Sequence, residues 1–385
     1  MTVKKKKKNI AVYGGSFNPP HLGHREAVMT AMRELKPDRL LVIPDHEPPH
    51  KELEAGSPTP EQRLELCRMT FGDLAGIEIS DMELKRSGKS YSFDTVRDLQ
   101  ERYPDSRLTL VIGTDMLLSF EEWYRFEYLL RHCRIAALTR DHEEEDKLRA
   151  TAERFRREYR ADIVLLDHVP MPMSSTELRR KLHQREGAEM IREEAYAEIV
   201  RNRFYDAKPE LGWLRRDAYT MLDEKRVPHV AGCEGEAVKL ARRWGEDPEN
   251  AAEAGILHDI TKRFSGKEQL NLCKKYAIIC DSAERSMPRL LHAKTGAAVA
   301  RERYGVSDEI YNAIRWHTTG KPDMTMLEKI IYLADYIEPT RDFPGVEKIR
   351  ALAYEDLDRA MLLGLQMTVE EVRADRKSTR LNSSH

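Results

Sequence analysis

The sequence predicts a doubly wound α/β domain followed by an all-α domain, and three observations lead to this prediction. Short β-rich apolar runs alternate with helical patterns up to about residue 205, as in a parallel sheet covered by helices. Beyond Pro209 the β-rich runs stop, and nearly every segment has helical periodicity. With 385 residues, the chain is also long for a single domain.

The composition argues against several classes of protein. The net charge of −2 provides no general attraction to nucleic acid or to anionic membranes. Five scattered cysteines without a Cys-x-x-Cys pair favour reduced thiols over disulfides or a zinc knuckle. No apolar run approaches the roughly 20 residues of a membrane span, so we expect a cytoplasmic protein. The lysine run at 4–8 is more typical of a solvated terminus than of a signal peptide or a nucleic-acid-binding arm.

The first predicted strand, Ile10–Tyr13, leads into the most informative segment of the chain. Two glycines and a rigid Asn-Pro-Pro turn follow it, and a helix is predicted over 22–35. His21 and His24 therefore lie three residues apart where this helix begins. Free backbone N–H groups and the helix dipole favour an anion at that place, so the segment predicts a phosphate site. The alternative is a strand–turn–helix with two incidental surface histidines.

The other elements of the first domain follow in alternation. Further strands are predicted at 39–44, 77–80, 108–113, 134–139 and 163–166. Further helices are predicted at 61–71, 93–103, 143–159, 177–184 and 195–205. Ligands of such a sheet bind beyond the carboxyl ends of its strands. The turn containing His21 and His24 lies at such an end, and so do Gly113 and Asp115.

A cluster of hydroxyl side chains at 174–176 opens the helix predicted at 177–184. Such a cluster is first of all an N-cap, and Glu177 is available for capping. The same hydroxyl and N–H groups can also hold a phosphate, which Arg179 could reach from one turn inside the helix. This segment by itself leaves both interpretations open.

Two segments together carry a family resemblance. Residues 15–24 resemble the nucleotidyltransferase signature Gly-x-Phe-x-Pro-x-His-x-Gly-His. Residues 173–179 are similar to the second signature of that superfamily, Ile-Ser-Ser-Thr-x-x-Arg, with Met173 at the Ile position. Four intervening segments resemble motifs of nicotinate-nucleotide adenylyltransferases: 48–51, 90–95, 113–115 and 122–124. The resemblance covers about residues 9–206 and implies a Rossmann-like nucleotidyltransferase domain, expected at 1–207.

The resemblance implies transfer of the adenylyl group of ATP to nicotinate mononucleotide, with release of pyrophosphate. His21 and His24 are the expected catalytic residues. Other ATP or phosphate contacts are expected from Gly14, Gly15, Ser16, Phe17, Gly113, Asp115, Ser175, Thr176 and Arg179. Contacts with the nicotinate nucleotide are expected from Lys51, Thr95, Trp123, Tyr124 and Arg140.

No enzyme nucleophile is required, because the phosphate of the nucleotide itself attacks ATP. Catalysis would consist of positioning and charge neutralisation, with Mg²⁺ carrying the departing pyrophosphate. Pantetheine-phosphate adenylyl transfer and cytidylyl transfer are the alternatives. The pair Trp123–Tyr124 and the segment 91–95 argue against both.

The second domain is expected at 208–375. Its helices are predicted at 214–225, 228–244, 251–260, 267–276, 289–304, 308–318 and 326–337. Six side chains suited to Fe, Mn or Zn occur in it: His229, His258, Asp259, His292, His317 and Asp335. Each has an ordinary explanation by itself, as a helix cap, a half-buried histidine or a solvated carboxylate. The adjacent pair His258-Asp259 at the end of an apolar helical stretch favours a metal site.

This pattern resembles the HD hydrolase superfamily. The segments 317–320 and 334–341 are more narrowly similar to bacterial diadenosine tetraphosphate hydrolases, over about residues 212–370. That resemblance implies symmetrical cleavage of the substrate to two ADP at a di-iron centre, with a metal-activated water. One ion is assigned to His229, His258, Asp259 and Asp335, and the other to Asp259, His292 and His317. Lys262 and Arg341 are the expected phosphate clamps.

Alternatives to this second activity are a structural ion, hydrolysis of other nucleotides, and a regulatory module that binds nucleotide without turnover. The expected partners of the chain are ATP, nicotinate mononucleotide and a dinucleoside polyphosphate, without a membrane or nucleic acid. A homo-oligomer is compatible with the sequence. Residues 376–385 are polar and without periodicity, and we expect a non-native tail there, with the native C-terminus missing.

Overall fold

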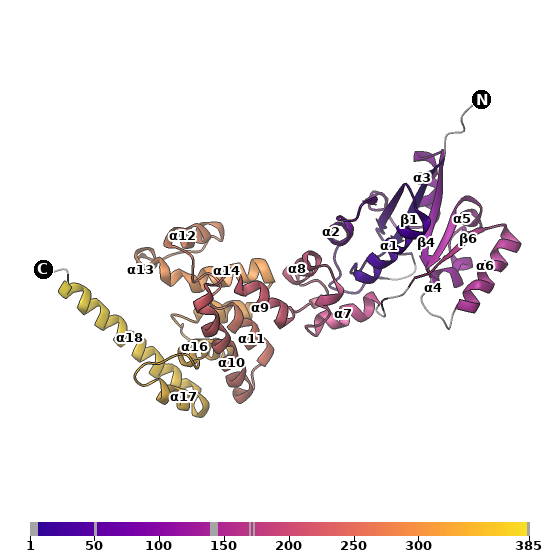
Figure 1. Ribbon diagram of the computed structural model, residues 1–385. Coiled ribbons are helices and arrows are strands. Elements are labelled where there is room, and N and C mark those ends of the chain that lie inside the picture. The colour runs from indigo at the N-terminus through magenta and orange to yellow at the C-terminus, as the bar shows by residue number, and fades with distance from the viewer. Residues whose placement is uncertain (1–6, 50–51, 139–144, 169–170, 172–173, 383–385) are drawn as a thin grey trace. The chain divides into compact units, whose positions relative to one another are not determined.

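The computed structural model describes residues 7–382 except 50–51, 139–144, 169–170 and 172–173 (Figure 1). The chain divides into two compact units, Met1–Lys208 and Pro209–His385. Among the described residues, none of the helices combines the length and apolar character needed to cross a membrane.

The first unit is built on a parallel sheet with the strand order β3-β2-β1-β4-β5-β6. Its strands are β1 (Lys8–Gly15), β2 (Arg39–Pro44), β3 (Ile77–Ile79), β4 (Ser106–Gly113), β5 (Arg134–Leu138) and β6 (Asp162–Leu166). The order reverses between β1 and β4, whose carboxyl ends lie side by side because Val12 pairs with Leu110. The doubly wound α/β prediction is confirmed, and the reversal marks the edge where such sheets bind ligands.

Helices cover both faces of this sheet (Figure 1). They are α1 (Leu22–Leu35), α2 (Pro60–Phe71), α3 (Ser92–Arg102), α4 (Thr114–Leu118), α5 (Phe126–His132), α6 (Glu145–Tyr159), α7 (Ser175–His183) and α8 (Glu193–Asn202). Along β1, Ile10 and Val12 pack with α3, α4, α5 and α6, whereas Ala11 and Tyr13 pack with α1 and α2. Successive side chains of a strand point to opposite faces, so this central strand is buried on both.

Three details of the first unit differ from the predictions. The glycines at 14 and 15 belong to β1 and do not break it, because both pair with β2. The helix predicted at 195–205 ends at Asn202, since Arg203 adopts a left-handed conformation with φ of 51°. The short helices α4 and α5 were not predicted, because neither has enough turns to produce a periodic pattern.

The second unit is helical throughout its described part, which confirms the all-α prediction. Its helices are α9 (Leu211–Tyr219), α10 (Val227–Trp244), α11 (Pro248–Leu257), α12 (Gly266–Lys275), α13 (Ser282–Ser286), α14 (His292–Tyr304), α15 (Asp308–Trp316), α16 (Met326–Ile337), α17 (Val346–Glu355) and α18 (Leu357–Asn382). Helix α10 packs against α11 and α16. Every residue of α11 from Ala251 to Leu257 is buried, which makes it the centre of this unit.

Some predicted boundaries in the second unit were wrong. The helix predicted at 214–225 ends at Tyr219, and the chain turns before α10 begins at Val227. Helix α11 ends at Leu257, so His258 lies at its C-cap and Asp259 just beyond it. Helix α18 continues to Asn382, so the tail expected to lack periodic structure is helical as far as that residue. Extending an existing helix costs far less than starting one, so polar residues can continue it.

Candidate active sites

The turn after β1 brings its two histidines together at the start of α1. The ring centroids of His21 and His24 are 3.7 Å apart, and the backbone N–H of His21 donates to Nδ1 of His24 over 3.2 Å. His21 is buried, with 6% of its surface exposed. Gly23 lets the rings approach, because a Cβ at this position would lie 3.0 Å from the His21 ring. The predicted His-x-x-His pair is therefore one unit at a helix N-terminus.

The second predicted phosphate segment lies against this turn. From the first turns of α7, the Ser175 hydroxyl donates to the Pro19 carbonyl over 3.3 Å. The Arg179 guanidinium donates to the Asn18 carbonyl over 2.9 Å and to Thr176 Oγ1 over 3.1 Å. Ser174 caps α7 through the N–H of Glu177, so the capping interpretation also applies. Hydroxyl groups, a guanidinium and two imidazoles thus meet at the carboxyl edge of the sheet.

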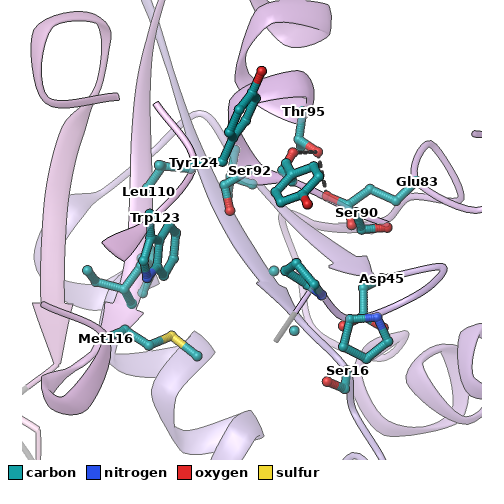
Figure 2. A pocket seen from close by; sticks show the side chains of 18 residues that line it. Ser16, Asp45, Glu83, Ser90, Ser92, Thr95, Leu110, Met116, Trp123 and Tyr124 are labelled. Atoms are coloured by element: carbon teal, nitrogen blue, oxygen red, sulfur yellow. Dashed lines mark hydrogen bonds between the residues drawn. The ribbon is translucent and has the colours of Figure 1, made fainter. Parts of the chain in front are cut away.

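A cavity of about 330 Å³ opens beside this turn, at the carboxyl ends of β1 and β4 (Figure 2). Gly14, Gly15 and Ser16 line one part of it, and Thr95, Trp123 and Tyr124 line another. In Figure 2, Trp123 and Met116 lie on one side of the cavity, and Glu83 and Ser90 lie on the opposite side. The residues predicted to contact the nicotinate nucleotide and the glycines after β1 therefore share one cavity.

The aromatic side chains of this cavity differ in exposure and in the rings that support them. Trp123 stacks on the buried Phe120 with ring centroids 4.9 Å apart, so its indole face is held in place. Tyr124 is 48% exposed and contacts Tyr91 at 5.0 Å. A fixed indole and a half-exposed phenol are suited to sandwich a flat heteroaromatic ring.

Other predicted contacts of the first unit are placed differently. The Phe17 side chain is buried in the core, 5.8 Å from the Phe71 ring, so only its backbone could meet a phosphate. That backbone has a left-handed φ of 46°, which turns the chain toward Asn18. Asp115 is exposed in the first turn of α4, two residues after Gly113. Lys51 and Arg140 lie outside the described residues.

Five of the six predicted metal-ligating side chains of the second unit lie around the sixth, Asp259. Oδ2 of Asp259 lies 3.4 Å from Nε2 of His258 and 3.8 Å from Nε2 of His229. Its other oxygen, Oδ1, lies 3.3 Å from Nε2 of His292 and 3.6 Å from Nε2 of His317. Asp335 joins the first pair, with Oδ1 3.0 Å from Nε2 of His229. One fully buried carboxylate thus faces two histidine pairs.

The chemistry of this cluster fits divalent metal ions. Three of the histidines direct Nδ1 to the backbone carbonyl three residues earlier, over 2.6–2.7 Å: His258, His292 and His317. This arrangement places the proton on Nδ1 and presents the Nε2 lone pair to the cluster. Nε2 of His229, Nε2 of His258 and Oδ1 of Asp259 are buried without a hydrogen bond in the described structure. Buried polar atoms are rarely left this way unless they bind something.

Charge within the cluster also suits metal binding. Burial lowers the pKa of His317 to about 4, so this imidazole is neutral at neutral pH. Burial disfavours the charge of Asp259, but the neighbouring histidines outweigh it and hold the Asp259 pKa well below its usual value. Neutral imidazole and ionised carboxylate are the forms that bind metals. Burial opposes the charge of His258, but Cys233 and Asp259 outweigh it and hold the His258 pKa well above its usual value, so a metal bound there would displace a proton.

Three cations surround the cluster. Lys262 Nζ lies 2.9 Å from Nε2 of His292, and Arg341 donates to Oδ1 of Asp335 over 2.6 Å. Both were predicted from the sequence. Arg226 was not, and its Nε donates to Oδ2 of Asp259 over 2.7 Å. Its position just before α10 carries no periodic or motif signal that would have revealed it.

Two family models match the chain. The cytidylyltransferase-like family matches residues 12–181, and the HD domain family matches residues 226–340. A symmetrical bis(5'-nucleosyl)-tetraphosphatase of Bacillus subtilis is 41% identical over 149 residues, which cover 38% of this chain and 80% of the relative. The chain therefore joins a cytidylyltransferase-like domain to an HD domain.

Relatives also cover the first domain and the whole chain. A "probable nicotinate-nucleotide adenylyltransferase" of Carboxydothermus hydrogenoformans is 32% identical, over 51% of this chain and 97% of the relative. A "probable nicotinate-nucleotide adenylyltransferase/Ap4A hydrolase" of Mycoplasma pneumoniae is 26% identical, over 95% of this chain and 100% of the relative. The name of this relative joins the two activities in one chain.

The cavity of the cytidylyltransferase-like domain contains acidic groups that sequence reasoning missed. Asp45 and Glu83 line it, and both are 7% exposed. Arg63 is fully buried and bonds Oδ1 of Asp45 over 2.8 Å and the Ser16 carbonyl over 2.6 Å. It thereby ties the turn after β1 to the end of β2. The position of Asp45 after a buried strand was the available signal, whereas nothing local marks Glu83.

Glu83 is expected to make the stability of this domain depend on pH. Burial raises its pKa to about 7, although a hydrogen bond from Thr95 and the charge of Arg86 oppose this shift. Since the unfolded value is about 4.3, the protonated carboxyl stabilises the fold at low pH. This contribution is lost as the pH rises through about 7. Glu83→Gln should therefore reduce the fall in the melting temperature of the full-length protein between pH 5 and pH 8. An unchanged pH profile in the variant would contradict this assignment.

Proposed function

We propose that this chain is a bifunctional enzyme of nucleotide metabolism. Its cytidylyltransferase-like domain transfers adenylyl from ATP to nicotinate mononucleotide, which yields nicotinate adenine dinucleotide and pyrophosphate. Its HD domain hydrolyses dinucleoside polyphosphates, with diadenosine tetraphosphate split to two ADP. The names of the relatives, one of which spans both domains, support this pair of activities.

The main support for the first activity is that the start of α7 contacts the turn after β1, beside the aromatic cavity. Arg179 and the turn at Asn18 are 161 residues apart in sequence and joined by a hydrogen bond of 2.9 Å. In the proposal, His21, His24 and the N-terminus of α1 bind ATP phosphates, while Ser175, Thr176 and Arg179 hold the triphosphate from the other side. Mg²⁺ bound with ATP would supply further positive charge for the leaving pyrophosphate.

The acceptor would enter the cavity next to this phosphate site. Trp123 and Tyr124 would enclose its pyridine ring, and Thr95 would contact the ring from the first turns of α3. Lys51 and Arg140 are retained as proposed nucleotide contacts, as is Asp115 near the adenylate. The phosphate of the acceptor is already ionised at neutral pH, so the residues need only align it with ATP.

The observation that carries the second activity is the position of Asp259 between two histidine pairs. In the proposal, His229, His258, Asp259 and Asp335 would hold one divalent ion, Asp259, His292 and His317 would hold the other, and iron would be the metal. Bound ions of this kind supply positive charge to a phosphate and lower the pKa of water. Lys262, Arg341 and Arg226 would bind phosphate oxygens, since each already lies at a carboxylate or an imidazole of the cluster.

A substrate panel tests the first activity. We expect pyrophosphate release from ATP with nicotinate mononucleotide and little with phosphopantetheine or with CTP and a sugar phosphate. The reason is that the cavity offers an aromatic pair to a flat ring. Release at equal rates with phosphopantetheine would overturn the substrate assignment. Binding of ATP without any release would support a regulatory domain instead.

The second activity is tested with diadenosine tetraphosphate. ADP should be the only nucleotide product, because symmetrical cleavage breaks the central bond of the polyphosphate. Formation of ATP and AMP would contradict symmetrical cleavage. Faster hydrolysis of a mononucleotide would identify another substrate for the same metal cluster.

A further inference from the structure

His229 differs from the other three histidines of the HD cluster in what holds its ring. The others direct Nδ1 to a backbone carbonyl of their own helical turn. His229 Nδ1 instead lies 2.9 Å from Oε1 of Glu338, a carboxylate 109 residues later in the chain. Glu338 is completely buried. A charged acceptor therefore supports one histidine, whereas neutral acceptors support three.

The Glu338 carboxylate is itself held in place. The backbone N–H of Thr340 donates to Oε2 over 2.7 Å, and the Thr340 hydroxyl donates to Oε1 over 2.5 Å. The Arg350 guanidinium bonds the Glu338 carbonyl over 2.9 Å. These contacts fix both oxygens, so the carboxylate determines the orientation of the His229 ring.

Helix α10 provides the space that this carboxylate occupies. Gly232 lies three residues after His229, on the same face of α10. A Cβ at Gly232 would lie 2.5 Å from Oε2 and 3.3 Å from Cδ of Glu338, closer than packed atoms tolerate. Gly235, on the same helix, has no atom within 4 Å of the corresponding position. The position of the Glu338 carboxylate thus leaves no room for a side chain at residue 232.

We propose that Glu338 is a positioning residue for the metal centre and that Gly232 makes room for it. The carboxylate holds the proton of His229 on Nδ1 and aims Nε2 at Asp335 and Asp259. It also makes Nε2 a stronger electron-pair donor to a metal ion. The ion beside His229 therefore depends on a buried charge on which the ion beside His292 and His317 does not depend. This inference rests on the two-ion site proposed above. Loss of such a partner typically weakens metal binding by about 10–100-fold.

Titration of the metal-free full-length protein with Co²⁺ tests this. The wild-type protein should bind two ions. Glu338→Gln keeps the shape of the side chain but removes its charge, so one ion should bind about 10–100-fold more weakly and the other unchanged. Gly232→Ala should have the same effect, and Gly235→Ala should bind both ions like the wild type.

A second readout does not involve metal. In the metal-free protein, the ¹⁵N-labelled His229 ring should show a slowly exchanging Nδ1 proton, and Gly232→Ala should abolish this signal. The outcomes separate the two proposals. A wild-type protein that binds no Co²⁺ would overturn the proposed metal site. If Glu338→Gln bound each of the two ions as tightly as the wild-type protein does, only the role of Glu338 would be overturned. The role of Glu338 would also be overturned if a folded Glu338→Gln protein lost both ions. The same conclusion would follow if Gly232→Ala and Gly235→Ala bound Co²⁺ with the same affinities.

Discussion

Asp259→Ala is expected to remove both metal ions and the hydrolase activity together, while adenylyl transfer continues. The reason is that each oxygen of this carboxylate faces a different histidine pair, at 3.3–3.8 Å. The loss of hydrolysis should exceed the roughly 10–100-fold effect of removing an outer partner of a metal ligand. Metal content and ADP release from diadenosine tetraphosphate measure the two effects in one preparation.

Asp358→Ala provides the matched control for this prediction. Its side chain is 76% exposed and pairs only with Lys329 at the surface among the described residues, so its removal should alter neither metal content nor rate. Hydrolysis that survives in metal-stripped wild-type protein, or in Asp259→Ala, would refute the metal-dependent mechanism. Adenylyl transfer in the same samples shows whether the first domain remains folded.

His24→Ala is expected to lower adenylyl transfer by roughly 10²–10³-fold, the usual cost of removing one group that stabilises the charge of a transition state. Its ring lies 3.7 Å from that of His21 at the N-terminus of α1, where the phosphates of ATP are proposed to bind. Pyrophosphate release measures the loss. Hydrolysis of diadenosine tetraphosphate should not change, because the HD cluster is in the other unit.

His24→Asn separates catalysis from helix capping. His24 Nδ1 accepts the N–H of His21 over 3.2 Å, and an asparagine side chain can accept this bond while lacking the rest of the ring. A low rate in both variants would assign the effect to the imidazole. Recovery of the rate in His24→Asn would show that the histidine acts mainly by capping α1.

Much of the fold could be predicted because its signals are local. Helices such as Leu22–Leu35 and Met326–Ile337 matched their predicted boundaries, since both are long and end at clear turn or capping residues. Predictions failed where a tertiary contact or a single backbone angle decides the end of an element. The left-handed Arg203 after α8 is one example. Short helices such as α5 were missed because one or two turns produce no periodic pattern.

The candidate sites divide in the same way. His21 with His24 and His258 with Asp259 lie close in sequence, so their spacing alone brought each pair to one helix end. Arg63, Glu83, Arg226 and Glu338 were missed, because each acts on residues far away in the chain. No spacing rule relates a residue to a partner on another element.

The two domains, the order of most of their elements and the residue types that carry chemistry could be predicted from the sequence. Those properties depend on hydrophobic periodicity and on motifs within a few residues of each other. The folded structure was needed to show which motifs meet, how Asp259 divides its oxygens between histidine pairs, and that Glu338 supports His229. Such contacts depend on how whole helices and strands pack together. Residues far apart in the chain can meet because the entropic cost of closing a loop rises only slowly with its length, so no local sequence pattern marks the partners.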